Sequence, residues 1–210
     1  MGAPRGRLGE MSKVSTAIVR AAVIGVAATA VVMVLRSSGA PPARPPHLVD
    51  FWADFDHIGQ TTIGDQPPPD APPPYARTTW GTHQVIVSNT RAVDVPTCFY
   101  WVGVVHPHDT VSGLPLFNPQ IGSGAAAAPK LRALFQIGVM RTGSLGDALY
   151  RHDLALGETT LPVRISLDPY LGQQVAVQFC TALSGTIPPQ LPAQFLGWAE
   201  PKIAQAPATP

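Results

Sequence analysis

The sequence predicts a mainly β protein, in which one N-terminal transmembrane helix is followed by an antiparallel β-sandwich of immunoglobulin-like or jelly-roll topology. Three observations predict this architecture. The run Ala21–Leu35 is uncharged and largely apolar, as a membrane span requires. The chain holds 24 prolines and 19 glycines but only 13% charged residues, which favours short elements joined by turns. Several stretches rich in β-branched and aromatic residues have the alternating pattern of strands.

The apolar character extends from Val14 to Leu35, which reaches the ~20 residues that a membrane-spanning helix needs. Arg20 lies close enough to the N-terminal end for its side chain to reach the interface. Basic residues are more frequent before the run than after it, which favours a cytoplasmic N-terminus. The sequence therefore predicts a cytoplasmic leader at 1–13 and an anchor, or uncleaved signal, at 14–36. The protein would be a single-pass cell-membrane protein with an extracytoplasmic body.

A cleaved signal peptide is the alternative for the same run. Its uncharged length suits the apolar region of a signal, and Ser38, Gly39 and Ala40 offer small residues for cleavage. Pro41 and Pro42 argue against cleavage there. This alternative predicts a secreted protein, so both interpretations export the body.

A Pro-rich linker is predicted at 37–76, and it contains one short amphipathic segment at 47–58. Apolar side chains recur in that segment at helical spacing, which predicts a short helix docked on the body or on a partner: Leu48, Phe51, Trp52, Phe55 and Ile58. His47, Asp50, Asp54 and His57 have the residue types of metal ligands, but a solvated polar face is the favoured interpretation. The sandwich is then expected at 77–200, with a disordered tail at 201–210.

Five strands are predicted in the body from their composition and alternation: 78–89, 98–106, 131–141, 160–168 and 174–182. A turn is expected at Ser88 and Asn89. An irregular excursion is expected at 107–130, and a helical turn at 143–151. In the aromatic group of the second strand, Tyr100 is expected on the face opposite Phe99 and Trp101. An exposed Tyr100 would mark a partner surface, but cover by a helix, a loop or a second sheet is the favoured interpretation.

The stretch Leu167–Phe179, LDPYLGQQVAVQF, leads from a tight turn into a strand. It resembles the turn-into-strand phrase that is common in jelly-roll carbohydrate-binding modules. The resemblance implies a sugar ligand. It covers 13 residues and assigns no binding residue.

Two cysteines, Cys98 and Cys180, lie in predicted strands. In an exported body such a pair indicates a disulfide. The bridge would join two strands of the sandwich. Two free buried thiols are the alternative, and they would require a cytoplasmic body.

His106 and His108 are the candidate metal ligands. Residues two apart in an extended segment face the same side, so both imidazoles would reach one ion. A third ligand would have to come from elsewhere, with His83 and His152 as candidates. A solvated turn around Pro107 is the alternative.

No catalytic or cofactor-binding residue is predicted. His152 precedes Asp153, but no activated nucleophile accompanies them, and phosphate-binding and dinucleotide-binding motifs are absent from the sequence. The formal net charge is +1 without a basic stripe, which argues against a nucleic-acid partner.

The leading hypothesis is a non-catalytic, membrane-anchored binding or accessory protein of a cell envelope, whose partners are the membrane and an envelope protein. A module that binds carbohydrate or cell-wall polymer is one alternative. An exported metal-binding protein or metal-dependent enzyme, using His106 and His108, is the other.

Overall fold

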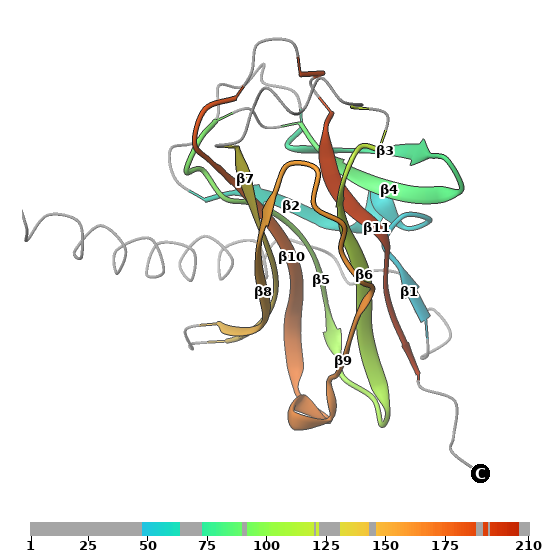
Figure 1. Ribbon diagram of the computed structural model, residues 1–210. Helices are drawn as coiled ribbons and strands as arrows, with labels where there is room; N and C mark the ends of the chain where they lie inside the picture. The colour runs from blue at the N-terminus through green and yellow to red at the C-terminus, as the bar shows by residue number, and fades with distance from the viewer. Residues whose placement is uncertain are drawn as a thin grey trace, which may run out of the picture.

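The computed structural model describes residues 48–63, 73–89, 92–119, 121, 131–142, 146–187, 191–192 and 194–205. These residues form two antiparallel sheets packed face to face (Figure 1). The predicted mainly β, sandwich-like fold is confirmed. The predicted leader and anchor, at 1–36, lie outside the described residues. Within the described ranges, no helix is long and apolar enough to cross a membrane.

Sheet A has the strand order β3-β4-β11-β6-β9, and a short strand β1 also pairs with β11. In chain order its strands are β1 (Leu48–Asp50), β3 (Tyr75–Trp80), β4 (His83–Ser88), β6 (Asp109–Phe117), β9 (Val163–Ser166) and β11 (Leu196–Gln205).

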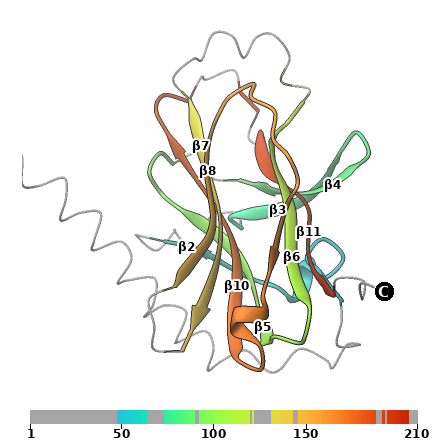
Figure 2. The same ribbon diagram turned by 60° about the horizontal axis from the view of Figure 1, so that its bottom comes forward.

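Sheet B has the order β2-β5-β10-β7-β8. In chain order its strands are β2 (Gly59–Thr62), β5 (Thr97–Val104), β7 (Arg132–Arg141), β8 (Asp147–Ala155) and β10 (Gln174–Ser184). Two 3-10 helices, η1 (Phe55–His57) and η3 (Asp168–Tyr170), lie between strands. The view of Figure 2 shows β7, β8 and β10 in one layer and β6, β9 and β11 in the other.

The core lies between the two sheets and is rich in aromatic rings. Phe99 and Phe179 from sheet B stack with centroids 5.2 Å apart, and Phe51 meets both rings edge-on. From sheet A, Trp198 meets Phe179 and Phe135 edge-on. Alternate residues of a strand face the same side, so the apolar half of each strand enters this core.

Three predicted strands are confirmed almost to the residue as β5, β7 and β10. In β7 the alternation places Ala133, Phe135, Ile137 and Val139 in the core. The predicted strand at 160–168 is confirmed as the shorter β9. The predicted strand at 78–89 is instead a hairpin, because Gly81 adopts a positive φ of 61° in the turn between β3 and β4.

The prediction of an amphipathic helix at 47–58 is wrong. Strand β1 ends at Asp50, whose carboxylate accepts the backbone N–H groups of Trp52 and Ala53, both at 3.0 Å. This side-chain bonding offers the backbone an alternative to a helix. The chain then turns, and Phe51 donates its N–H to the Pro201 carbonyl and buries its ring in the core. The segment does pack against the body, as expected, through the buried ring of Phe51.

The predicted body at 77–200 is too short at both ends. Strands β1 and β2 join the sheets ahead of it, and β11 continues through residues 201–205 of the predicted disordered tail. Pro201 favours an irregular tail in the sequence, because proline is rare inside a central strand. A bulge at Glu200, whose φ is 50°, accommodates the proline, and Lys202 resumes pairing with Ser112.

Two further predictions are wrong in the middle of the chain. Residues 109–117 of the expected irregular excursion form β6, although Gly113 and Pro115 are typical of loops. Strand β6 pairs with β11 along nearly its whole length, and this long-range pairing overrides the local signal. The expected helical turn at 143–151 is largely strand β8, which pairs with β7.

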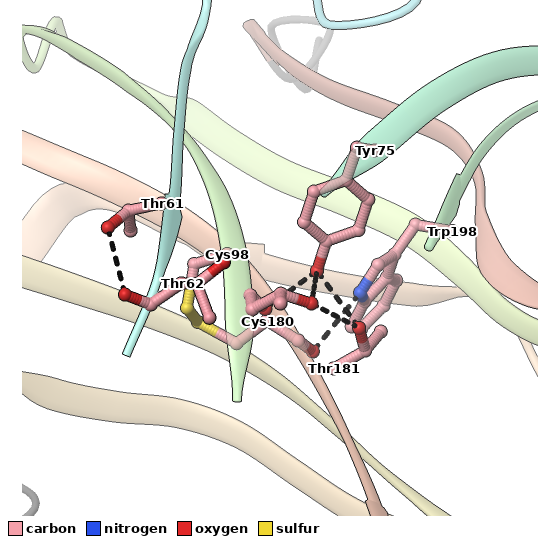
Figure 3. Close-up of a disulfide and its surroundings, with 8 residues drawn as sticks. Thr61, Thr62, Tyr75, Cys98, Cys180, Thr181 and Trp198 are labelled. Carbon is pink, nitrogen blue, oxygen red and sulfur yellow. Dashed lines mark hydrogen bonds between the residues drawn. A yellow bond between two sulfur atoms is a disulfide. The ribbon is translucent and has the colours of Figure 1, made fainter. Parts of the chain in front are cut away.

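A buried group of three hydroxyls links β3 to sheet B (Figure 3). The Tyr75 hydroxyl donates to the Thr97 carbonyl at 2.6 Å and lies 2.9 Å from the Thr181 hydroxyl. The Thr97 hydroxyl donates to the Tyr75 hydroxyl at 3.1 Å. Burial raises the pKa of Tyr75 to about 12, because the phenolate would lose its hydration there.

We expect Tyr75→Phe to lower the free energy of unfolding by about 1–2 kcal/mol at pH 7, since two buried hydroxyls lose a partner. The Tyr75 pKa also makes a pH-dependent contribution. Because the folded pKa is raised above the usual value of 10.0, this contribution is complete below pH 10 and is lost as the pH rises towards 12. Urea unfolding between pH 7 and 11.5 measures both effects. A variant as stable as the wild type, with the same alkaline loss, would contradict this account.

Candidate binding face

The outer face of sheet B presents its side chains in rows that run across the strands. Phe99 and Phe179 point into the core, so Tyr100 and Gln178 point outward. Strand pairing aligns Gly59, Tyr100, Gln178, Gly138 and Ala148 in one row. The prediction that Tyr100 lies opposite Phe99 is confirmed.

Glycine at position 59 lets the Tyr100 ring lie flat on the sheet. A Cβ atom at Gly59 would be 2.1 Å from the Tyr100 ring, so no other residue fits without moving the ring. Tyr100 is only 5% exposed and forms part of the floor of this face. Burial raises the pKa of its phenol, which stays protonated as a hydrogen-bond donor.

Gln178 lies against Gly138 in a similar way. A Cβ atom at Gly138 would be 3.0 Å from Gln178 Nε2, closer than most real contacts. The neighbouring row holds Gln136, which pairs with Cys180 on one side and Arg151 on the other. Both glutamines are partly exposed, and within the described ranges no residue hydrogen-bonds to either side-chain amide. Each amide can therefore both donate and accept towards a ligand.

The face carries little charge. Arg132 donates from Nε to Asp153 Oδ2 at 2.9 Å, so this pair is neutral overall. Arg151 is exposed and lies across from Gln136. Towards the other end of the face lies an apolar row. Its residues Val102, Ala176 and Met140 pair across the strands and contact one another.

The disulfide predicted between Cys98 and Cys180 is confirmed. The two cysteines lie directly opposite each other on β5 and β10 of sheet B, with Cα atoms 4.1 Å apart (Figure 3). Both belong to the row that includes Gln136. The bridge therefore holds the strands that carry Tyr100 and Gln178 in fixed register.

The predicted metal ligands lie away from this face, in the turn between β5 and β6. His108 has a positive φ of 65° after Pro107, and Asp109 donates its N–H to the His106 carbonyl at 3.2 Å. The His106 and His108 N–H groups donate to Asp109 and Asp168 at 2.8 and 3.0 Å. Proline followed by a positive φ is typical of a type II turn.

Asp168 supports this turn from η3. Its carboxylate accepts the Ser166 hydroxyl and the His108 N–H, and these bonds hold its pKa below the usual range. Among the residues that the structure describes, no three His, Cys, Asp or Glu side chains gather as a metal site requires. His83 is a candidate third ligand in the sequence, but its Nδ1 lies 3.0 Å from Glu200 Oε1. Metal binding by His106 and His108 stays a prediction.

The structure separates His152 from Asp153. Consecutive strand residues face opposite sides, and in β8 His152 pairs with Phe135 while Asp153 pairs with Leu134. Asp153 binds Arg132, and the His152 ring lies 6.1 Å from the Tyr150 ring. This histidine and carboxylate cannot act together as the base and its orienting group in hydrolysis.

No family model matches the chain, and no curated protein matches it. Among solved structures, a mutant of Xylanase10C from Cellvibrio japonicus, bound to xylopentaose, has a TM-score of 0.38 at 13% identity over 71% of this chain. Tailspike protein 4 of bacteriophage CBA120 has a TM-score of 0.33 at 12% identity over 71% of this chain. A structure titled "CBM4 structure and function" has a TM-score of 0.35 at 8% identity, and the match covers 80% of this chain and 94% of that chain.

This chain spans 27% of the xylanase and 18% of the tailspike protein. Similarity this low, in superposition and in identity, supports neither a family assignment nor a function.

Proposed function

We propose that this chain is an exported, non-catalytic binding module whose ligand is a polysaccharide of the cell envelope. The observation that carries the proposal is a pair of partly exposed side-chain amides on the outer face of sheet B, those of Gln136 and Gln178. Sugar hydroxyls both donate and accept hydrogen bonds, and side-chain amides match them in both roles.

The extent of the face also suits a chain of sugars. From β5 to β8 the row crosses three strand spacings, roughly 14 Å. That length fits several linked sugars better than one. The glycines at 59 and 138 keep the face low, so an extended polymer meets no obstruction from these positions.

The strand order supports the jelly-roll alternative for the sandwich. Eight of the eleven described strands form two four-stranded layers, β4-β11-β6-β9 and β5-β10-β7-β8, and two such layers are typical of jelly rolls, including lectin domains. Strands β1, β2 and β3 are additional to these layers. In antibody-type immunoglobulin domains the disulfide joins the two sheets, whereas Cys98 and Cys180 belong to one sheet.

Export is proposed on two grounds. A disulfide between buried cysteines is typical of oxidising compartments outside the cytoplasm. The apolar run at 14–36 would keep the module at the cell membrane, with the Pro-rich segment before Leu48 as its spacer. Cleavage of that run would give a secreted module with the same binding face.

Affinity electrophoresis of the full chain, in gels containing soluble β-glucan, xylan or galactan, tests the proposed function. We expect retardation by at least one polymer. Gln136→Ala/Gln178→Ala removes two uncharged hydrogen bonds, about 2 kcal/mol together, and should raise Kd roughly 30-fold. Gln84→Ala removes an exposed glutamine of sheet A and should change nothing. Equal retardation of all three proteins would refute this binding face.

An envelope protein is a second candidate ligand, as the leading hypothesis from the sequence holds. Val104 and Leu171 are 45% and 51% exposed, and the Gly172 N–H donates to the Val105 carbonyl, which joins their segments. Exposed apolar side chains at one end of a sandwich suit a protein contact. Affinity capture from solubilised membranes, with wild type and Val104→Ser/Leu171→Ser, would identify a partner that depends on this end.

A further inference from the structure

We infer that the polysaccharide is anionic, and that Arg151 binds a carboxylate of its sugars. This inference rests on the proposed function and names the ligand class of the same face. It begins from the charges on the outer face of sheet B. Arg132 and Asp153 neutralise each other, which leaves Arg151 as the source of net charge on this face of the described strands.

Arg151 has the features of a ligand-binding cation. It is exposed, and among the described residues no carboxylate pairs with it. The nearest acidic residue towards the start of β8, Asp147, pairs with Val139 of the core-facing set, so it belongs to the opposite face. Asp147 is also engaged there, by Arg141 at 3.3 Å and by the Tyr170 hydroxyl at 3.0 Å.

The position of Arg151 links it to the glutamines. Directly paired residues of antiparallel strands have Cβ atoms about 5 Å apart, so Arg151 and Gln136 can contact the same or adjacent sugars. A guanidinium binds a carboxylate through two parallel N–H···O bonds. A sugar carboxylate at the β8 edge would therefore fix the polymer while the amides bind hydroxyls further along the row.

Arg164 provides a matched control within the same molecule. It is exposed on the outer face of sheet A, where it pairs with Ser112, and among the described residues no carboxylate pairs with it either. Among the described residues around it there is no row of glutamines. Loss of Arg164 and loss of Arg151 change the net charge equally but only the second touches the proposed face.

The test compares polygalacturonate and alginate with their carboxyl-reduced, uncharged forms, using the full chain in detergent at low salt. We expect each anionic polymer that binds to do so about tenfold more tightly than its reduced form, with the preference falling as salt increases. Arg151→Gln should abolish the preference, so that this variant binds the anionic and the reduced form of each polymer equally. Arg151→Lys should keep part of the preference for the anionic polymer. Arg164→Gln should keep the whole preference.

Binding of the reduced polymers without any preference for the anionic forms would overturn the role of Arg151 while leaving the proposed function intact. A preference for the anionic forms that survives in Arg151→Gln would also overturn the role of Arg151. Failure to bind any polymer here, together with failure to bind the neutral polymers above, would overturn both proposals.

Discussion

Replacing Phe51 with alanine is expected to lower the free energy of unfolding by about 3–5 kcal/mol, the cost of removing a fully buried phenylalanine. The Phe51 ring is 0% exposed and meets the rings of Phe99 and Phe179 at 5.6 and 5.1 Å. Its segment looks like a linker in the sequence, so this loss would show that the segment belongs to the core. Urea unfolding of the full chain, followed by tryptophan fluorescence, measures it.

Phe55→Ala is the control from the same segment. Phe55 is only partly buried and lies under the Arg77 guanidinium, 5.5 Å from its ring centroid, so we expect a loss of about 1 kcal/mol. Equal, small losses for both variants would mean that residues 48–62 are an appendage of the sandwich.

Removal of the disulfide is expected to have a similarly large effect. Cys98 and Cys180 are 82 residues apart, and cross-linking a loop of that length stabilises the fold by about 4.5 kcal/mol in the chain-entropy model. Cys98→Ala/Cys180→Ala should therefore unfold at much lower urea than the wild type.

A reductant provides the control for this variant. It should lower the unfolding midpoint of the wild type towards that of the variant and leave the variant itself unchanged. A wild-type midpoint that does not respond to complete reduction, verified by thiol titration of the unfolded protein, would contradict a stabilising bridge.

Strand prediction from the sequence succeeds where the local pattern and the tertiary pairing agree. Strand β7 alternates cleanly, and its core residues are the ones that the alternation selects. The cysteines could be paired because the sequence contains only two. Prediction fails where long-range pairing overrides local signals, as at Pro115 in β6 and Pro201 in β11, each of which is accommodated by neighbouring strands.

The candidate binding face could not be predicted for a related reason. Gln136 and Gln178 are 42 residues apart, and only the register between β7 and β10 brings their strands together. Nothing in a single sequence sets that register. The alternation of Gln178 with Phe179 does show that Gln178 faces away from the core, which is the one local signal for this site.

The central claim is that sheet B, through its outer face, binds a polysaccharide. Chemical-shift mapping tests it most directly: 15N-labelled full chain in detergent is titrated with fragments of the polymer that retards it most. We predict that the largest shifts fall on the side-chain amides of Gln136 and Gln178 and on backbone amides around Arg151. Shifts confined to sheet A, or to the turn at His106–Asp109, would contradict the claim.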